Sequence, residues 1–128
     1  MTETNWQKVQ IDQFKTADDM YISPFYSDGK TLGTPTWIWS VVVDDALYVR
    51  AYNGQKSRWY QSAKTQKAGQ IHLANQKFNV SFKPVLNTNE LDEKINQAYK
   101  EKYAHSPYLP PMLESGPISA TVKILPQP

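Results

Sequence analysis

Basic and hydrogen-bonding side chains gather at one predicted turn of this 128-residue chain. The members of this 50–58 cluster are Arg50, Asn53, Gly54, Lys56, Ser57 and Arg58. Ser57 is a residue type that caps helices, and a helix that begins there presents unpaired backbone N–H groups and a partial positive charge. With two arginines expected at the surface beside it, this helix start suits a phosphate group. The alternative is an ordinary connection between a hairpin and a helix, with solvated basic residues.

A β-hairpin with two chemically different faces is predicted for residues 36–52, with its turn at Asp44 and Asp45. Side chains alternate along a strand, so counting back from the turn gives the cross-strand pairs of one face. These pairs are Val43–Ala46, Val41–Tyr48, Trp39–Arg50 and Trp37–Tyr52. The other face carries residues suited to a barrel interior: Thr36, Ile38, Ser40, Val42, Leu47, Val49 and Ala51.

The aromatic face of this hairpin has two interpretations. Trp37 and Trp39 could stack on the flat ring of a ligand, beside the Arg50 guanidinium. Exposed Trp, Tyr and Arg side chains are also typical of protein interfaces. We therefore expect a homodimer that buries part of the face formed by Trp37, Trp39 and Tyr48, which is compatible with a ligand at the subunit interface. Trp59 is expected to anchor the following helix.

Three helices are predicted from apolar spacing and capping residues. The first covers 11–17, and the second covers 57–68 and ends at Gly69. The third begins at a capping box formed by Asn87 and Glu90. Its apolar stripe is expected to be core, at Leu91, Ile95, Ala98 and Tyr99.

The remaining strands are expected over 20–25, 71–74, 78–82 and 118–124. Pro24 places the first of them at a sheet edge, and residues 106–117 form a proline-rich loop. Local antiparallel pairing that must avoid open edges favours a small barrel, and the helices are too few to cover a parallel sheet. The predicted fold class is mainly β (α+β), an antiparallel split β-barrel of about six strands with peripheral helices.

Composition limits the classes of function. A chain of this length forms one domain, 1–128. It has no cysteine, and two isolated histidines do not make a metal site. The net charge of +2 is too small and too dispersed for nucleic acid. A signal-peptide pattern and an apolar run of about 20 residues are both lacking, so we expect a cytoplasmic protein without a membrane role.

Four segments resemble one known family: GTPTWIW at 33–39, LYVR at 47–50, RWY at 58–60 and INQAYKEKY at 95–103. They resemble the bacterial domain of unknown function 2255, over roughly residues 11–126. That family in turn resembles the split β-barrels that bind flavins, among them pyridoxamine-phosphate oxidases and deazaflavin-dependent nitroreductases. Two features depart from the deazaflavin binders. Their basic run is reduced here to Lys30, and the loop at 53–57 lacks their pattern of small residues.

Two functional hypotheses follow. The resemblance implies binding of FMN or a deazaflavin at a subunit interface and activity as an oxidoreductase, in which the cofactor supplies the redox chemistry. The 50–58 cluster would hold the phosphate, and Trp37 and Trp39 would contact the ring. No side chain is placed as an acid or base, so no catalytic residue is named. The alternative is a cofactor-free barrel for small-molecule binding or interaction, which the reduced basic run favours.

Overall fold

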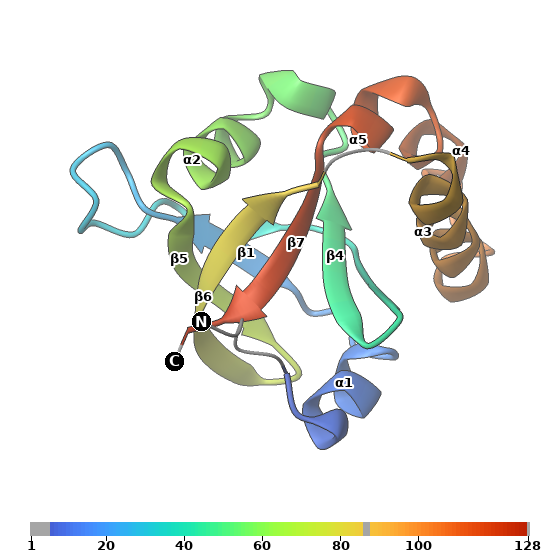
Figure 1. Ribbon diagram of the computed structural model, residues 1–128, viewed down its shortest axis with the longest axis horizontal. Helices are drawn as coiled ribbons and strands as arrows, with labels where there is room; N and C mark the ends of the chain where they lie inside the picture. Colours follow the sequence, from blue (N-terminus) through green and yellow to red (C-terminus); the bar gives the residue numbers. More distant parts are fainter. Residues whose placement is uncertain (1–5, 86–87, 128) are drawn as a thin grey trace.

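A computed structural model describes residues 6–85 and 88–127. Seven strands form one antiparallel sheet that curls into a half-barrel with helices around it (Figure 1). The strands are β1 (Tyr21–Pro24), β2 (Thr36–Trp37), β3 (Ser40–Val43), β4 (Ala46–Arg50), β5 (Ala68–Leu73), β6 (Gln76–Pro84) and β7 (Thr121–Pro126). The helices are α1 (Lys8–Phe14), the 3-10 helix η1 (Gly54–Lys56), α2 (Arg58–Gln66), α3 (Asn89–Lys102), α4 (Leu109–Met112) and α5 (Ser115–Ser119). This architecture confirms the predicted fold class.

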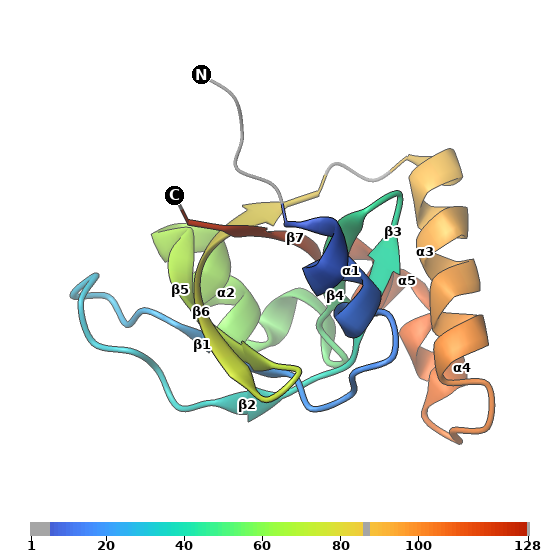
Figure 2. The ribbon, with the colours of Figure 1, turned by 90° about the horizontal axis from the view of Figure 1, so that it is seen from below.

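The strand order explains how the sheet curls. The order is β2-β1-β5-β6-β7-β4-β3, so β2 and β3 lie at opposite edges. In the chain, however, only Ile38 and Trp39 separate them. One bent segment therefore supplies both edges, and the sheet has to wrap round to meet it (Figure 2). Wrapping of this kind limits the exposed edge that would otherwise pair with other chains.

The predicted hairpin register is correct near the turn and wrong beyond the bend. Val43 pairs with Ala46 and Val41 with Tyr48, as expected. Trp37 does not face Tyr52, because it leaves the hairpin and pairs with a residue of β1. The backbone of the bend follows the same course, since the Ile38 N–H donates to a carbonyl oxygen of Met20 at 3.0 Å. The pairing of Trp39 with Arg50 is lost for the same reason.

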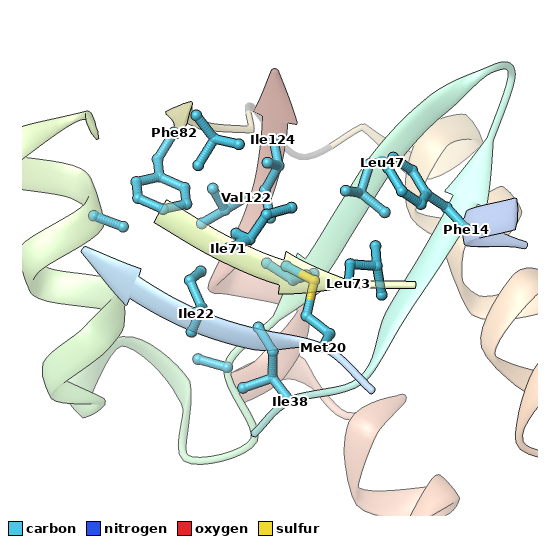
Figure 3. Packing of buried hydrophobic residues seen from close by; sticks show 14 of the residues in the cluster. Phe14, Met20, Ile22, Ile38, Leu47, Ile71, Leu73, Phe82, Val122 and Ile124 are labelled. Atoms are coloured by element: carbon cyan, nitrogen blue, oxygen red, sulfur yellow. The ribbon is translucent and has the colours of Figure 1, made fainter. Parts of the chain in front are cut away.

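The interior face of the hairpin joins the main core. Leu47, Val49 and Ile38 are buried, as predicted. Figure 3 shows Leu47 and Ile38 among side chains from the neighbouring strands, which include Ile22, Ile71, Leu73, Val122 and Ile124. Thr36, predicted for the same face, is exposed because it lies before the bend. Burial of this continuous apolar layer is the main stabilising contribution to the sheet.

The opposite face of the hairpin is covered by the chain itself. Ile95 and Tyr99 of α3 are buried against Val41, Val43 and Tyr48. This packing confirms that the apolar stripe of the third helix is core. It corrects the expectation of an open aromatic face, because Tyr48 is only 7% exposed. The argument for a dimer through that residue is therefore removed, although dimerisation itself stays a prediction.

Several element boundaries differ from those predicted. The first helix begins at Lys8 and ends at Phe14, and Ile118 belongs to α5 and not to the last strand. The loop predicted for 106–117 contains α4 and the start of α5. Thr88 caps α3, since its hydroxyl accepts the Leu91 N–H, while the predicted capping residue Asn87 lies outside the described residues. Within the ranges described, every helix is too short or too polar to span a bilayer.

The first strand is also placed differently from the prediction. β1 is not an edge strand, because Tyr21 and Ile22 pair with β2. Pro24 lies past the end of β2, where no partner strand needs its missing N–H on that side. The second hairpin is longer than predicted, with a two-residue turn at Ala74 and Asn75, both at positive φ.

Gly69 does not end α2, because Lys67 takes the left-handed conformation there and Gly69 pairs with Pro24 inside the sheet. A Cβ at Gly69 would lie 2.7 Å from the Pro24 Cα and closer still to the Ser23 carbonyl oxygen.

Because this space is already occupied by backbone, we expect Gly69→Ala to lower the free energy of unfolding by about 1–3 kcal/mol or more, measured by urea denaturation. The matched control is Gly116→Ala, where a Cβ meets no atom within 4 Å. An equal, small effect of both changes would contradict this account.

Candidate functional site

A cavity of about 880 Å³ opens where the bend, the end of β4, the start of α2 and the segment before α4 meet. Its volume lies within the range of small-molecule sites, which is about 300–1,000 Å³. The lining residues of this aromatic cavity are Thr36, Trp37, Ile38, Trp39, Arg50, Tyr52, Asn53, Ser57, Arg58, Trp59, Ser106, Pro107, Tyr108 and Met112. The lining combines aromatic walls with a few polar groups, which is typical of ligand sites.

Most of the residues predicted for a ligand site come together here. The six that line the cavity are Trp37, Trp39, Arg50, Asn53, Ser57 and Arg58. The other two, Gly54 and Lys56, belong to η1 and do not line it. Gly54 is buried with a φ of +72°, and a Cβ there would meet the backbone of Gly116 in α5. Its role is close packing of two helices, while Lys56 is exposed.

The two predicted tryptophans are held in different ways. Trp39 is half-buried and stacks on Tyr103, with ring centroids 4.1 Å apart and planes 5° from parallel. Trp37 is 53% exposed, but its Nε1 donates to the Asp18 carbonyl oxygen at 2.9 Å. One wall is therefore supported by packing and the other is oriented by a hydrogen bond. Both indoles are preorganised in a way that lowers the cost of stacking a ligand.

The sequence suggested that Arg50 lies at the surface, but its side chain is buried and only 1% exposed. Its Nη1 donates to the Asn96 side-chain oxygen and, at 3.2 Å, to the Met112 carbonyl oxygen. Its Nη2 donates to the Asp92 carbonyl oxygen at 3.3 Å, and the guanidinium lies over the Tyr99 ring. Burial lowers the pKa of Arg50, which nearby Tyr99 and Asp92 partly offset. The side chain thus fastens α3 and α4 to the end of β4.

Arg58 keeps the surface position that the sequence predicted. It is exposed, is the first residue of α2 and lines the cavity. The preceding Ser57 has extended backbone geometry, but its side chain makes no capping hydrogen bond and the first turn has no acidic residue. The Ser57 hydroxyl and the positive end of the helix therefore remain available to an anion at the cavity wall.

Part of the lining was not predicted from sequence. Trp59 was expected to be a helix anchor, and it both packs against the main core and lines the cavity. Ser106, Pro107 and Tyr108 were assigned to a loop without a role. Tyr108 is 61% exposed, and its ring meets that of Tyr52 edge to face, with centroids 6.4 Å apart. A tyrosine within a proline-rich run is the signal that could have identified this segment from the sequence.

Across the described residues, no group of three acidic, His or Cys side chains could hold a metal ion.

Lys102 supports the bend from behind. Its Nζ donates to the carbonyl oxygens of Phe14 at 3.2 Å and of Ala17 and Ser40 at 2.7 Å. The adjacent Tyr103 hydroxyl also contacts the backbone of Ser40. One side chain therefore ties the end of α1 and the start of β3 to α3. Its neighbour in sequence, Tyr103, supports the Trp39 wall.

The two arginines of the cavity should differ strongly in their effect on stability. Arg50→Met removes the donor of three hydrogen bonds that join the end of β4 to α3 and α4, so we expect the free energy of unfolding to fall by about 2–4 kcal/mol. Arg58→Ala removes an exposed side chain, so we expect a change within about 0.5 kcal/mol. Urea denaturation of both variants provides the comparison. Small effects of both changes would mean that Arg50 does not fasten α3.

A pH dependence is expected from Lys102. Burial lowers its pKa to about 8, which the carboxylates of Asp18 and Asp19 partly offset. The pKa of a lysine in the unfolded chain is about 10.4. Between the folded and unfolded pKa values, the unfolded chain therefore binds more protons than the folded protein, and a higher pH favours the folded state. The stability of the wild type relative to Lys102→Met should therefore increase between about pH 7 and about pH 9.5. Urea denaturation checks this, with the exposed-lysine variant Lys100→Met as control, and a decrease would contradict it.

Comparisons with known proteins agree with this fold. A search of curated proteins gives no match. Among solved structures, the crystal structure of a conserved hypothetical protein from Mycobacterium tuberculosis is similar, with a TM-score of 0.57 and 14% sequence identity. The similarity covers 97% of this chain and 81% of that chain, and at this identity it supports the fold alone. A family model described as an uncharacterized protein conserved in bacteria (DUF2255) matches residues 10–124, so this chain belongs to that family.

Proposed function

We propose that the aromatic cavity binds a flat aromatic small molecule with an anionic group, and that a flavin-type cofactor, FMN or a deazaflavin, is the first candidate. The observation that carries this proposal is the meeting of aromatic walls and an arginine at a helix N-terminus in one cavity of about 880 Å³. Trp37 and Trp39 offer indole surfaces to a ring. Ser57 and Arg58 offer a hydroxyl, backbone N–H groups and a charge to a phosphate.

The fit to such a cofactor is partial. Arg58 is available, but Lys56 does not line the cavity and the Nη atoms of Arg50 are already hydrogen-bonded within the protein. A phosphate would therefore meet one exposed arginine where the sequence suggested three basic residues. A bound flavin would supply the redox chemistry of an oxidoreductase, while this chain would bind and orient it.

A second candidate function follows from the same observation. A cavity with one exposed cation and several aromatic walls also suits a small aromatic acid that takes no part in redox chemistry. The protein would then be a cofactor-free binding module, as the reduced basic run also favours. In either case two exposed aromatic side chains at the cavity, Trp37 and Tyr108, are the surface we propose for a homodimer contact. Sedimentation equilibrium measures that association.

Flavin binding is tested with the purified protein, by its visible absorbance and by fluorescence titration with FMN and with a deazaflavin. We expect Arg58→Ala to remove a charge-assisted contact worth about 1.5–3 kcal/mol, which weakens FMN affinity by about 10- to 150-fold. The matched control is Lys56→Ala, which removes an exposed cation two residues away that does not line the cavity.

The outcomes separate the two candidate functions. A colourless protein that binds neither flavin at tens of micromolar would rule out the cofactor and leave the binding module. Flavin binding that is equally weakened by both changes would mean that the phosphate responds to general charge and not to the α2 helix start.

A further inference from the structure

The guanidinium of Arg50 carries five N–H donors, and three of them make hydrogen bonds to described residues. Its Nη atoms donate to oxygens of α3 and α4, whereas Nε is buried and has no hydrogen-bond partner in the described part of the chain. Burial of an unpaired donor is costly, so such groups are rare in folded proteins. This one belongs to a side chain that is 1% exposed and yet forms part of the cavity lining.

The charge of Arg50 is not screened by water. The acceptors of its three hydrogen bonds are neutral oxygens, namely one amide oxygen and the carbonyl oxygens of Asp92 and Met112. The Asp92 carboxylate also acts on the guanidinium through its charge, but it accepts none of these hydrogen bonds. On another side it lies 5.4 Å from the centre of the Tyr99 ring. A charge in such surroundings acts on a second charge more strongly than an exposed residue would. An anion in the cavity would therefore be stabilised from behind the aromatic wall.

We propose that Arg50 is a specificity-determining residue of the aromatic cavity, whose buried charge selects anionic flat aromatic ligands over neutral ligands of the same shape. The inference rests on the proposed function, in which this cavity binds a flat aromatic molecule. The ligand class is an aromatic carboxylate, sulfonate or phosphate, since all present the charged oxygens that a guanidinium attracts. Arg58 adds an exposed charge, but the selection persists without it.

Asn96→Asp tests the role of this charge with little change of shape. The side-chain oxygen of Asn96 accepts from Arg50 Nη1, so an isosteric carboxylate there neutralises the guanidinium without entering the cavity. The matched control is Gln97→Glu, which makes the same change of charge at the next residue of α3. Gln97 is exposed, and its side-chain Nε2 donates a hydrogen bond to the Glu101 carboxylate. It is not among the partners of the Arg50 guanidinium and does not line the aromatic cavity.

The probes are two fluorescent molecules with the same aromatic framework, the anionic 1-anilinonaphthalene-8-sulfonate and the neutral N-phenyl-1-naphthylamine, which lacks the sulfonate. We expect the wild type to prefer the anionic probe. Asn96→Asp should reduce the ratio of the two affinities by about ten-fold, whereas Gln97→Glu should leave it within about two-fold. Arg58→Ala should lower the ratio only in part, and the part that remains should resist added salt because Arg50 is buried.

The outcomes distinguish this inference from the proposed function. Equal affinity of the wild type for both probes, or a preference that Asn96→Asp leaves unchanged, overturns the role of Arg50 while cavity binding stands. Loss of the whole preference in Arg58→Ala overturns it too. If the wild type binds neither probe and neither flavin, both the inference and the proposed function fail. Thermal unfolding of each variant confirms that it is folded, and Arg58→Ala keeps the test decisive if Asn96→Asp is unstable.

Discussion

The structure depends on one segment that serves both edges of the sheet. The chain passes from β2 to β3 through Ile38 and Trp39, and these two strands lie at opposite ends of the strand order. Because the segment is short, the sheet has to curl until its two ends meet it. The cavity lies beside the bend, since Ile38 and both flanking tryptophans line it. The same constraint thus shapes the barrel and places aromatic side chains at its opening.

Arg50 shows how the fold and the site depend on each other. It ends β4, so the barrel fixes its position, and its hydrogen bonds then hold α3 and α4 against that strand. Those helices bring Met112, and the segment before it, to the cavity. A residue that looks like a ligand contact in the sequence is therefore first a structural connection. The effect that we propose for it on a ligand is electrostatic and needs no direct contact.

The sequence predicted the features that are set locally, and missed those that depend on distant contacts. The turn at Asp44 and Asp45 fixes its own register, so Val41 and Tyr48 were paired correctly. Nothing local marks the bend at Ile38, which arises because β1 competes for the backbone of Trp37. Burial of Arg50 could not be predicted either, since its partners lie more than 40 residues further along the chain.

The pairing of β4 with β7 joins Leu47 to Ile124, so the barrel forms only when strands far apart in sequence have met. Contacts of such long range generally make folding slow and cooperative, on the millisecond-to-second scale. The walls of the cavity come from both halves of the chain, so the cavity exists only in the folded state. Any ligand that fills it must therefore stabilise the whole domain, by about 2.7 kcal/mol at 100 times its dissociation constant. The melting temperature thus reports occupancy of this cavity for a ligand of any chemistry.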